Sequence, residues 1–369
     1  MVQFSSLFNG FAKTISKKSG RKSREDVGRE AANALAKEAR KNELILTTSG
    51  CVNAISSHNF ASLHSRQGKK GVNQDRAVVW EEFGGQEDMI FCGVFDGHGP
   101  WGHLVAKRVR ELVPSSLLCN WQKTVAHNMD NINIGLDDSQ LDVWKQSHIK
   151  ACSAVDQQLK QQADSFYSGT TALTLVKQGD VMVVANVGDS RAVLATADDD
   201  GKLVAVQLTV DLKPNLPGER ERIMRSKGKV WSSDDEPGVY RVWMPDPNGG
   251  VAVEGPGLAV SRAFGDHYIK DFGLISEPQL TFRNITFRDQ FAILATDGVW
   301  DVVSNQEAVE IVWSAPEKEE SAKRLVEHAV CAWKRTRRGI AMDDMSAICL
   351  FFHTSSQQVD CVKKKKKIA

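Results

Sequence analysis

Three apolar runs in this chain end in the same way, with an aspartate at or just past the last strand-like residue. Each run is rich in Val, Ile, Phe and Ala and is long enough for one buried β-strand, and a nearby glycine permits a sharp exit. If these strands are neighbours, their carboxylates gather at one edge of a sheet. The runs and their aspartates are Met89–Phe95 with Asp96, Val181–Val187 with Asp189, and Phe291–Thr296 with Asp297.

Carboxylates gathered in this way repel one another strongly unless a cation lies between them. Their oxygen atoms are hard ligands, which suit Mg²⁺, Mn²⁺ or Ca²⁺ better than zinc. The sequence Asp96-Gly97-His98-Gly99 places a histidine beside the first of these aspartates. The pattern therefore predicts a carboxylate metal site with His98 at its rim.

The formal net charge of +1 conceals an uneven distribution of charge. Residues 1–24 carry six basic and no acidic side chains, and residues 363–369 carry five lysines and no acid. Without these eleven basic residues, 36 Lys and Arg stand against 46 Asp and Glu, so the body carries about −10. An acidic body argues against a nucleic-acid groove and fits a protein that concentrates carboxylates for cations.

The seven cysteines form no C-x-x-C pair, and Cys92 and Cys349 lie inside apolar runs, where a reduced thiol behaves as a small hydrophobic group. This usage predicts a reducing, intracellular setting, in the cytoplasm and/or the nucleus. No N-terminal stretch resembles a signal peptide, and no window approaches a membrane span.

Two basic ends flank one body. We expect a basic arm and helix at residues 1–57, a globular domain at 58–354 and a polybasic tail at 355–369. Apolar residues at helical spacing in the arm are typical of a membrane-surface helix or a docking segment, and equally of a disordered leader. The tail lysines suit a nuclear address, an anionic-membrane contact or a solvated tail.

Short β-rich segments alternate with helical ones in the body. Four strands with tight polar breaks between residues 171 and 209 predict an antiparallel meander, and helical patterns cover Gly102–Leu118 and Leu141–Ala163. Residues 231–250 are rich in Pro and Gly and predict a long irregular lobe. Antiparallel strands with clustered helices favour the α+β class over a doubly wound sheet.

Seven short motifs occur in a fixed order within residues 58–354. Any single motif would be weak, but together they resemble the metal-dependent type 2C serine/threonine protein phosphatases and are most similar to the plant branch. The motifs are Gly-Val-Asn-Gln-Asp (71–75), Val-Phe-Asp-Gly-His-Gly (94–99), Ser-Gly-Thr-Thr-Ala (168–172), Asn-Val-Gly-Asp-Ser-Arg (186–191), Leu-Ala-Val-Ser-Arg-Ala-Phe-Gly-Asp (258–266), Ala-Thr-Asp-Gly-Val-Trp-Asp (295–301) and Asp-Asp-Met-Ser (343–346).

The resemblance implies a sandwich of two antiparallel β-sheets flanked by helices, a four-layer α-β-β-α arrangement within the α+β class. It implies that residues 58–354 are a catalytic domain that hydrolyses phosphoserine and phosphothreonine in proteins. We therefore expect phosphorylated protein substrates as partners, no nucleic acid, and a monomer. Contact with an anionic membrane is expected only through the basic ends.

The resemblance also implies two Mg²⁺ or Mn²⁺ ions per subunit and identifies the residues that hold them. Asp96 matches the aspartate that bridges the two ions, and the Gly97 carbonyl matches a second ligand in the same turn. Further matches complete the set: Asp75, Asp297 and Asp343 as additional ligands of the pair, and Asp189 and Asp301 as positions linked to a weaker third cation.

Two cations about 3.5–4 Å apart activate a water for in-line attack on phosphorus. The leaving Ser or Thr alkoxide needs a proton, and His98 is the candidate general acid. Lys70 stands nearest to the position where relatives often place a phosphate-gripping arginine, and it would bind phosphate as a point charge. Many relatives have an acidic pair where this chain has Gln74-Asp75, which predicts a weaker metal affinity at most.

The other motif residues are expected to support the site. The Ser168-Gly169-Thr170-Thr171 segment reads as a tight strand entry, and Trp300 as a core residue. We expect Arg191, Arg262 and Asp266 to hold loops by ion pairing, without a part in the chemistry.

Two alternative functions compete with this interpretation. A catalytically weak relative that acts as a phosphoprotein-binding module would have lost ligand carboxylates, whereas this chain keeps Asp75, Asp96, Asp297 and Asp343. A metal-dependent nuclease is opposed by the acidic body, which would repel a polyanionic substrate.

Overall fold

The computed structural model describes residues 51–52, 60–129, 136–245 and 254–353. Most of the expected basic arm and the whole polybasic tail lie outside the described residues. Among the helices that are described, none combines the length and the apolar character needed to cross a membrane.

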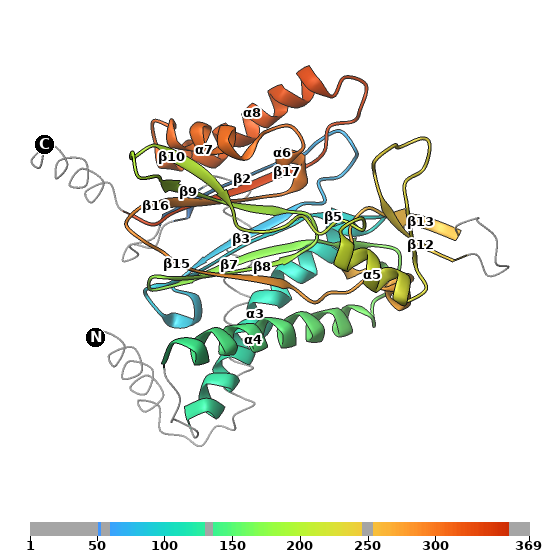
Figure 1. Cartoon of the computed structure of the whole chain (residues 1–369), viewed down its shortest axis with the longest axis horizontal. Helices are drawn as coiled ribbons and strands as arrows, with labels where there is room; N and C mark the ends of the chain where they lie inside the picture. Colours follow the sequence, from blue (N-terminus) through green and yellow to red (C-terminus); the bar gives the residue numbers. More distant parts are fainter. Residues whose placement is uncertain (1–50, 53–59, 130–135, 246–253, 354–369) are drawn as a thin grey trace, which may run out of the picture.

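Two antiparallel sheets stack face to face at the centre of the molecule (Figure 1). In spatial order, the six-stranded sheet contains β1 (Cys51–Val52), β2 (Phe60–Arg66), β17 (Met345–Phe351), β16 (Asp289–Ala295), β9 (Arg191–Ala197) and β10 (Leu203–Gln207). The five-stranded sheet contains β15 (Gln279–Asn284), β8 (Val181–Val187), β7 (Ala172–Gln178), β4 (Met89–Phe95) and β3 (Arg76–Glu81).

A pair of helices covers each outer face of the sandwich (Figure 1). The helices α3 (Gly102–Met129) and α4 (Leu136–Leu159) pack on the five-stranded sheet, and α7 (Asn305–Trp313) and α8 (Ser321–Thr336) pack on the six-stranded sheet. The predicted four-layer α-β-β-α arrangement is thus confirmed.

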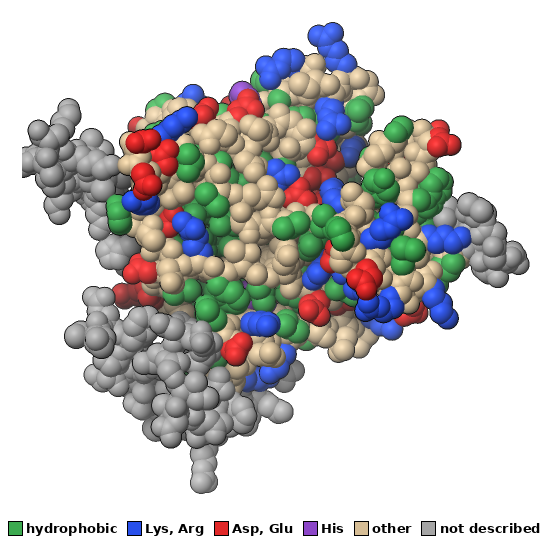
Figure 2. Space-filling model, in the orientation of Figure 1, with side chains coloured by type: hydrophobic (Ala, Val, Ile, Leu, Met, Phe, Trp, Pro, Cys, Tyr) green, Lys and Arg blue, Asp and Glu red, His purple; other side chains and the backbone are tan. Residues whose placement is uncertain are grey.

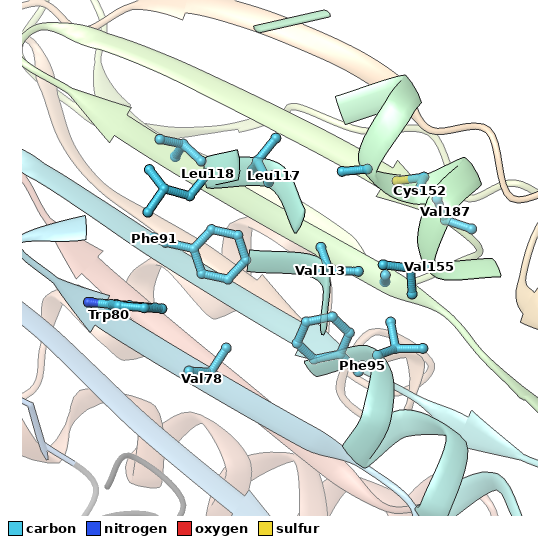
Figure 3. Packing of buried hydrophobic residues seen from close by; sticks show 14 of the residues in the cluster. Val78, Trp80, Phe91, Phe95, Val113, Leu117, Leu118, Cys152, Val155 and Val187 are labelled. Atoms are coloured by element: carbon cyan, nitrogen blue, oxygen red, sulfur yellow. The ribbon is translucent and has the colours of Figure 1, made fainter. Parts of the chain in front are cut away.

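Strand β4 is apolar along its whole length, and both of its faces are buried. Phe91 and Phe95 point from one face of the strand into the cluster shared with α3 and α4 (Figure 3). Ile90, Cys92 and Val94 point from the other face into the cluster between the two sheets. Because successive side chains of a strand alternate between its faces, a strand buried on both sides must be apolar at every position.

Two small sheets lie at one end of the sandwich. One sheet joins β14 (Phe264–Gly265), β6 (Gly169–Thr170) and β5 (Gly97–His98), and the other joins β11 (Lys229–Trp231), β12 (Arg241–Met244) and β13 (Glu254–Leu258). The short helices are α5 (Pro217–Arg225), α6 (Asp297–Trp300) and the 3₁₀ turns Phe83–Gly85, Ala163–Ser165, Lys270–Phe272 and Lys318–Glu320.

The lobe predicted to be irregular contains ordered β-structure instead. Its strands β11, β12 and β13 form an antiparallel sheet, while residues 246–253 lie outside the described part of the chain. Val230 and Val242 are buried in a small cluster with Ile223 of α5, and this packing stabilises the sheet in spite of the Pro and Gly content. Composition alone does not reveal such tertiary contacts.

Helix α3 runs to Met129, well past its predicted end at Leu118. The added turns carry Trp121, whose ring stacks on Trp144 of α4 with 5.3 Å between the ring centroids. Helix α4 ends at Leu159, before the predicted Ala163, and a 3₁₀ turn follows. The contact between the two helices therefore accounts for the extra length of α3, which the local sequence pattern did not predict.

Candidate active site

Strand pairing brings four of the predicted ligands to the same end of the sandwich. Arg76 pairs with Phe95, so Asp75, before β3, lies beside Asp96, after β4. Ala295 pairs with Ala347 in the other sheet, so the end of β16, where Asp297 follows, lies beside the start of β17, which Asp343 precedes. Figure 2 shows acidic side chains gathered in the region between the α6 and β5 labels of Figure 1, with basic side chains beside them.

Asp75 links the two sheets. Its Oδ2 atom accepts a 2.8 Å hydrogen bond from Oγ1 of Thr296, at the end of β16. Its Oδ1 atom is buried and has no hydrogen-bond partner among the described residues. Burial raises the pKa of Asp75 to about 7, against the opposing effects of the Ser346 and Thr296 hydroxyls and with a smaller contribution from the Asp344 carboxylate. A buried carboxylate oxygen without a partner calls for a cation or a proton.

Asp96 and Asp297 lie in the field of the other carboxylates. Burial raises the pKa of Asp96 well above its usual range, and Asp297 and Asp75 raise it further. Burial likewise raises the pKa of Asp297, with Asp189 and Asp343 as the next causes. The predicted aspartates are therefore close enough to oppose one another's ionisation, as a divalent-cation site requires.

Lysines rather than aspartates are the direct partners of two of these carboxylates. Lys70 Nζ contacts Asp343 Oδ2, and Lys213 Nζ contacts Asp189 Oδ2. Within the described ranges, no three His, Cys, Asp or Glu side chains are arranged so that they could hold one ion. The carboxylates lie in one region, and the ammonium groups of Lys70 and Lys213 neutralise part of their negative charge.

The donor atoms present nevertheless fit hard divalent cations. All predicted ligands are oxygen atoms, the ligand type that Mg²⁺ and Mn²⁺ prefer. Besides Asp75 Oδ1, the Oε1 atom of Gln74 is buried and lacks a hydrogen-bond partner among the described residues. These two oxygen atoms are the clearest sign that the site accepts a positive partner.

Gln74 holds the loop that carries His98. Its Nε2 atom donates a 3.1 Å hydrogen bond to the Gly99 carbonyl, and its backbone N–H donates at 2.8 Å to Oδ2 of Asp344. Asp344 also accepts a 2.7 Å hydrogen bond from the Gly68 N–H. Asp343 and Asp344 thus differ in role, because Asp344 ties loops together while Asp343 contacts Lys70.

Lys70, the candidate phosphate-binding residue, lies beside the predicted ligand Asp343. About half of its side chain is exposed. Burial lowers the pKa of Lys70, but the hydrogen bond and charge of Asp343, followed by Asp297 and Asp96, raise it more. Its ammonium is consequently held in the charged form beside the predicted ligands.

His98 is paired with a buried aspartate that the sequence did not assign to the chemistry. His98 Nε2 lies 2.6 Å from Oδ2 of Asp266, which is only 2% exposed. Burial lowers the pKa of His98, but the Asp266 charge and hydrogen bond, with Asp189 behind them, produce a net rise. The expectation that Asp266 merely holds a loop was therefore incomplete, because its partner is the candidate general acid.

Gly169 leaves room for this pair. A Cβ atom at this position would lie 2.0 Å from Asp266 Oδ2 and 2.7 Å from His98 Nε2. Its neighbours fix the turn that carries Asp96, since the Thr171 N–H and the Thr170 hydroxyl both donate to the Asp96 carbonyl, at 2.9 and 3.0 Å. The Ser-Gly-Thr-Thr segment is the structural support that the sequence predicted.

Gly97 lies in β5, between Asp96 and His98, and pairs with Thr170 of β6. Asp301, at the end of α6, is about half exposed, and burial of the remainder raises its pKa against the lowering effects of Arg337 and Lys213. Arg337 Nη2 lies 3.9 Å from an Asp301 carboxylate oxygen.

The remaining motif residues behave as expected. Arg191 forms an ion pair with Asp211, and Arg262 forms one with Glu219. Trp300 is 8% exposed and donates a 2.9 Å hydrogen bond from its ring nitrogen to the Ala295 carbonyl. These contacts make the two arginines and the tryptophan parts of the framework.

A sequence model described as Protein phosphatase 2C matches residues 62–335, nearly three quarters of the chain. The chain belongs to the protein phosphatase 2C family. The matched span includes Asp75, Asp96, Asp297 and His98, whereas Asp343 lies just beyond its end.

Plant members of the family are similar over almost the whole chain. "Probable protein phosphatase 2C 34" of Arabidopsis thaliana is 59% identical over 363 residues, covering 96% of this chain and 99% of that protein. "Probable protein phosphatase 2C 48" of Oryza sativa subsp. japonica is 55% identical, with 96% and 99% covered. The serine-threonine phosphatase 2C of Toxoplasma gondii matches in structure with a TM-score of 0.71 and 27% identity, covering 82% of this chain and 97% of that one.

These similarities confirm the resemblance to plant phosphatases and the sandwich fold. The chain is thus a metal-dependent protein serine/threonine phosphatase of the plant type, dependent on Mg²⁺ or Mn²⁺, and its substrates are phosphorylated proteins.

Proposed function

We propose that this chain hydrolyses phosphoserine and phosphothreonine with two divalent cations held at the edge of the sandwich, and with His98 as the general acid. The observation that carries the proposal is the convergence of Asp75 and Asp96 from one sheet with Asp297 and Asp343 from the other. Their mutual effect on pKa values supports a site that requires added positive charge.

Asp75, Asp96, Asp297, Asp343 and the Gly97 carbonyl would hold the two ions, and Asp189 with Asp301 would attract a weaker third. When bound, Mg²⁺ or Mn²⁺ stabilises charge on the phosphoryl oxygens and activates the attacking water. The protein contributes rigid placement of the ligands, because Asp75, Asp96, Asp297 and Asp343 each lie within two residues of a strand.

Lys70 would attract the substrate phosphate. Its ammonium contacts Asp343 and is half exposed, so a phosphate that enters from solvent can share this charge. Lysine interacts with phosphate as a point charge and lacks the bidentate geometry of arginine, so its contribution is to affinity more than to orientation.

His98 would donate a proton to the departing Ser or Thr oxygen. An alkoxide is a poor leaving group, and a positioned acid accelerates its departure by about 10²–10⁴-fold. Burial opposes protonation of His98, but the charge and hydrogen bond of Asp266 outweigh burial and raise the pKa of His98. Asp266 would also fix the ring orientation through the 2.6 Å contact at Nε2.

The test measures hydrolysis of a phosphothreonine peptide with Mn²⁺ by three proteins. The wild type should release phosphate, and EDTA should stop it. Asp297→Asn should lose about 100-fold or more of kcat/KM, because it removes one negative ligand at constant volume. Asp199→Asn is the control, since Asp199 is 91% exposed in the turn between β9 and β10, at the opposite end of β9 from the site.

Full activity of Asp297→Asn would contradict the ligand assignment. Binding of the peptide by the wild type without turnover at any Mn²⁺ concentration would favour the phosphoprotein-binding module. Circular dichroism of both variants checks that the fold is retained.

A further inference from the structure

A lysine that the sequence analysis did not single out lies among the carboxylates of the additional cation site. Lys213 Nζ contacts Asp189 Oδ2 directly. The Asp189 side chain is 5% exposed, whereas the Lys213 side chain is 41% exposed. The Lys213 ammonium group therefore reaches from the surface and covers one side of the nearly buried Asp189 carboxylate.

Backbone hydrogen bonds of the neighbouring Leu212 hold Lys213 in this position. The Leu212 N–H donates a 3.0 Å hydrogen bond to the Gly188 carbonyl, directly before Asp189 in the chain. The Leu212 carbonyl in turn accepts 2.9 Å hydrogen bonds from the N–H and the hydroxyl of Ser261. These hydrogen bonds hold the segment that carries Lys213 against the turn that carries Asp189. The fold of the backbone therefore places the two charged groups side by side.

The charge of Lys213 acts on the other carboxylates of the same group. Burial lowers the pKa of Lys213, but Asp189 raises it more, and Asp297 and Asp301 add to that rise. Burial raises the pKa of Asp297 and Asp301, and Lys213 opposes that rise at both. The positive charge of Lys213 therefore acts on Asp189 and Asp301, the two aspartates predicted for the third cation, and on Asp297 beside them.

We infer that Lys213 competes with the third cation: its ammonium occupies the charge position that Asp189 offers, so a third Mg²⁺ or Mn²⁺ binds only by displacing it. This inference rests on the proposed two-ion function and adds the reason why the additional site is weak. Lysine suits the role because its long flexible stem allows withdrawal to solvent, where much of the side chain already lies. An ion with two charges is attracted more strongly to Asp189 and Asp301 than an ammonium is, but it must first break the ion pair between Lys213 and Asp189.

The experiment counts and ranks Mn²⁺ sites by isothermal titration calorimetry and by electron paramagnetic resonance of free Mn²⁺. Lys213→Met removes the charge and keeps most of the apolar stem, and Lys213→Gln is a second variant in case the first fails to fold. Lys213→Arg keeps the charge. Arg225→Met is the matched control, because Arg225 is 76% exposed and pairs with Glu221 on the surface of α5.

We expect the wild type and Lys213→Arg to bind two ions tightly and a third weakly. Lys213→Met and Lys213→Gln should bind the third ion at least about tenfold more tightly, with the first two sites changed less. A third site of wild-type affinity in both neutral variants would overturn the inference and leave the two-ion proposal standing. The same tightening in Arg225→Met would also overturn it, because net charge would then explain the effect. A wild type that takes up no Mn²⁺ would instead contradict the proposed function itself.

Discussion

His98 and Asp266 show how one buried pair can serve a chemical step. The pair lies 168 residues apart in sequence and 2.6 Å apart in space, in a region where Asp266 is almost fully buried. A carboxylate at Nε2 stabilises the protonated ring. At the residue scale, the account is tested by substrates that differ in their need for that proton.

His98→Ala should lower kcat about 100-fold or more on a phosphothreonine peptide, whose alkoxide leaving group must be protonated. On p-nitrophenyl phosphate, whose leaving group needs no proton, the loss should remain under about tenfold. Initial rates at saturating Mn²⁺ give both values. Equal losses on the two substrates would count against the general-acid role.

The sequence identified most of the aspartates of the site, and motif order located Asp343. It did not identify Asp266 as the partner of His98, nor Lys213 as the partner of Asp189. Asp266 ends one of the motifs, but the motif does not name its partner, which lies 168 residues away. Lys213 has no local pattern that distinguishes it from a surface charge. Such pairings depend on the tertiary fold and are visible only in the structure.

At the scale of single elements, the short strand β6 carries a glycine whose side-chain position is already filled. Gly169→Ala would bring its Cβ to 2.0 Å from Asp266 Oδ2 and 2.6 Å from the Phe264 carbonyl. We expect a loss of about 1–3 kcal/mol in the free energy of unfolding, as for other overpacked sites, together with a lower kcat on the phosphopeptide.

Urea unfolding of Gly169→Ala and Gly218→Ala provides the comparison. No heavy atom would lie within 4 Å of a Cβ at Gly218 apart from its chain neighbours and its own helix backbone, so that variant should keep wild-type stability or gain slightly. Wild-type stability and activity in Gly169→Ala would show that the His98–Asp266 region tolerates the displacement and that its close packing is unimportant.

Helix α4 contains a histidine that makes stability depend on pH. Burial lowers the pKa of His148 to about 4, against the smaller opposing effect of its 2.8 Å contact with the Trp144 carbonyl. The unfolded chain therefore binds a proton between pH 6.5 and 4 that the folded protein excludes, and stability falls as pH drops through this window. From pH 8 to pH 5, this group should cost about 2 kcal/mol.

His148→Leu removes the titrating group, so its free energy of unfolding should fall less between pH 8 and pH 5 than that of the wild type, by about the same 2 kcal/mol. Urea titrations of EDTA-treated protein at both pH values measure the two differences. Identical pH dependence in wild type and variant would show that His148 is protonated at the same pH in both states.

The strands β4 and β8 were predicted with their observed bounds, because each is a continuous apolar run that is buried along almost its whole length. The three-stranded sheet at 229–258 was missed, since its short strands are stabilised by contacts with α5 and by pairing across long connections. The ends of α3 and α4 depend on their packing against each other.

At the scale of the whole molecule, the site exists only because the two sheets stack. Neither sheet alone contains the full set, as Asp75, Asp96 and Asp189 flank strands of one while Asp297 and Asp343 flank strands of the other. The hydrogen bond from Thr296 to Asp75 is a direct link across this junction. The aspartates after the apolar runs predicted a metal site. The two-sheet sandwich that brings them together was predicted only from the family resemblance, because the spacing of the strands in the sequence does not specify it.

The most direct measurement of the central claim is an anomalous difference map from a crystal of the wild-type protein grown with Mn²⁺. The account predicts two strong Mn²⁺ peaks within ligand distance of Asp96, with Asp297 and Asp343 among their ligands. Mn²⁺ peaks only at sites remote from these three aspartates, or a map without any bound ion at saturating Mn²⁺, would contradict it.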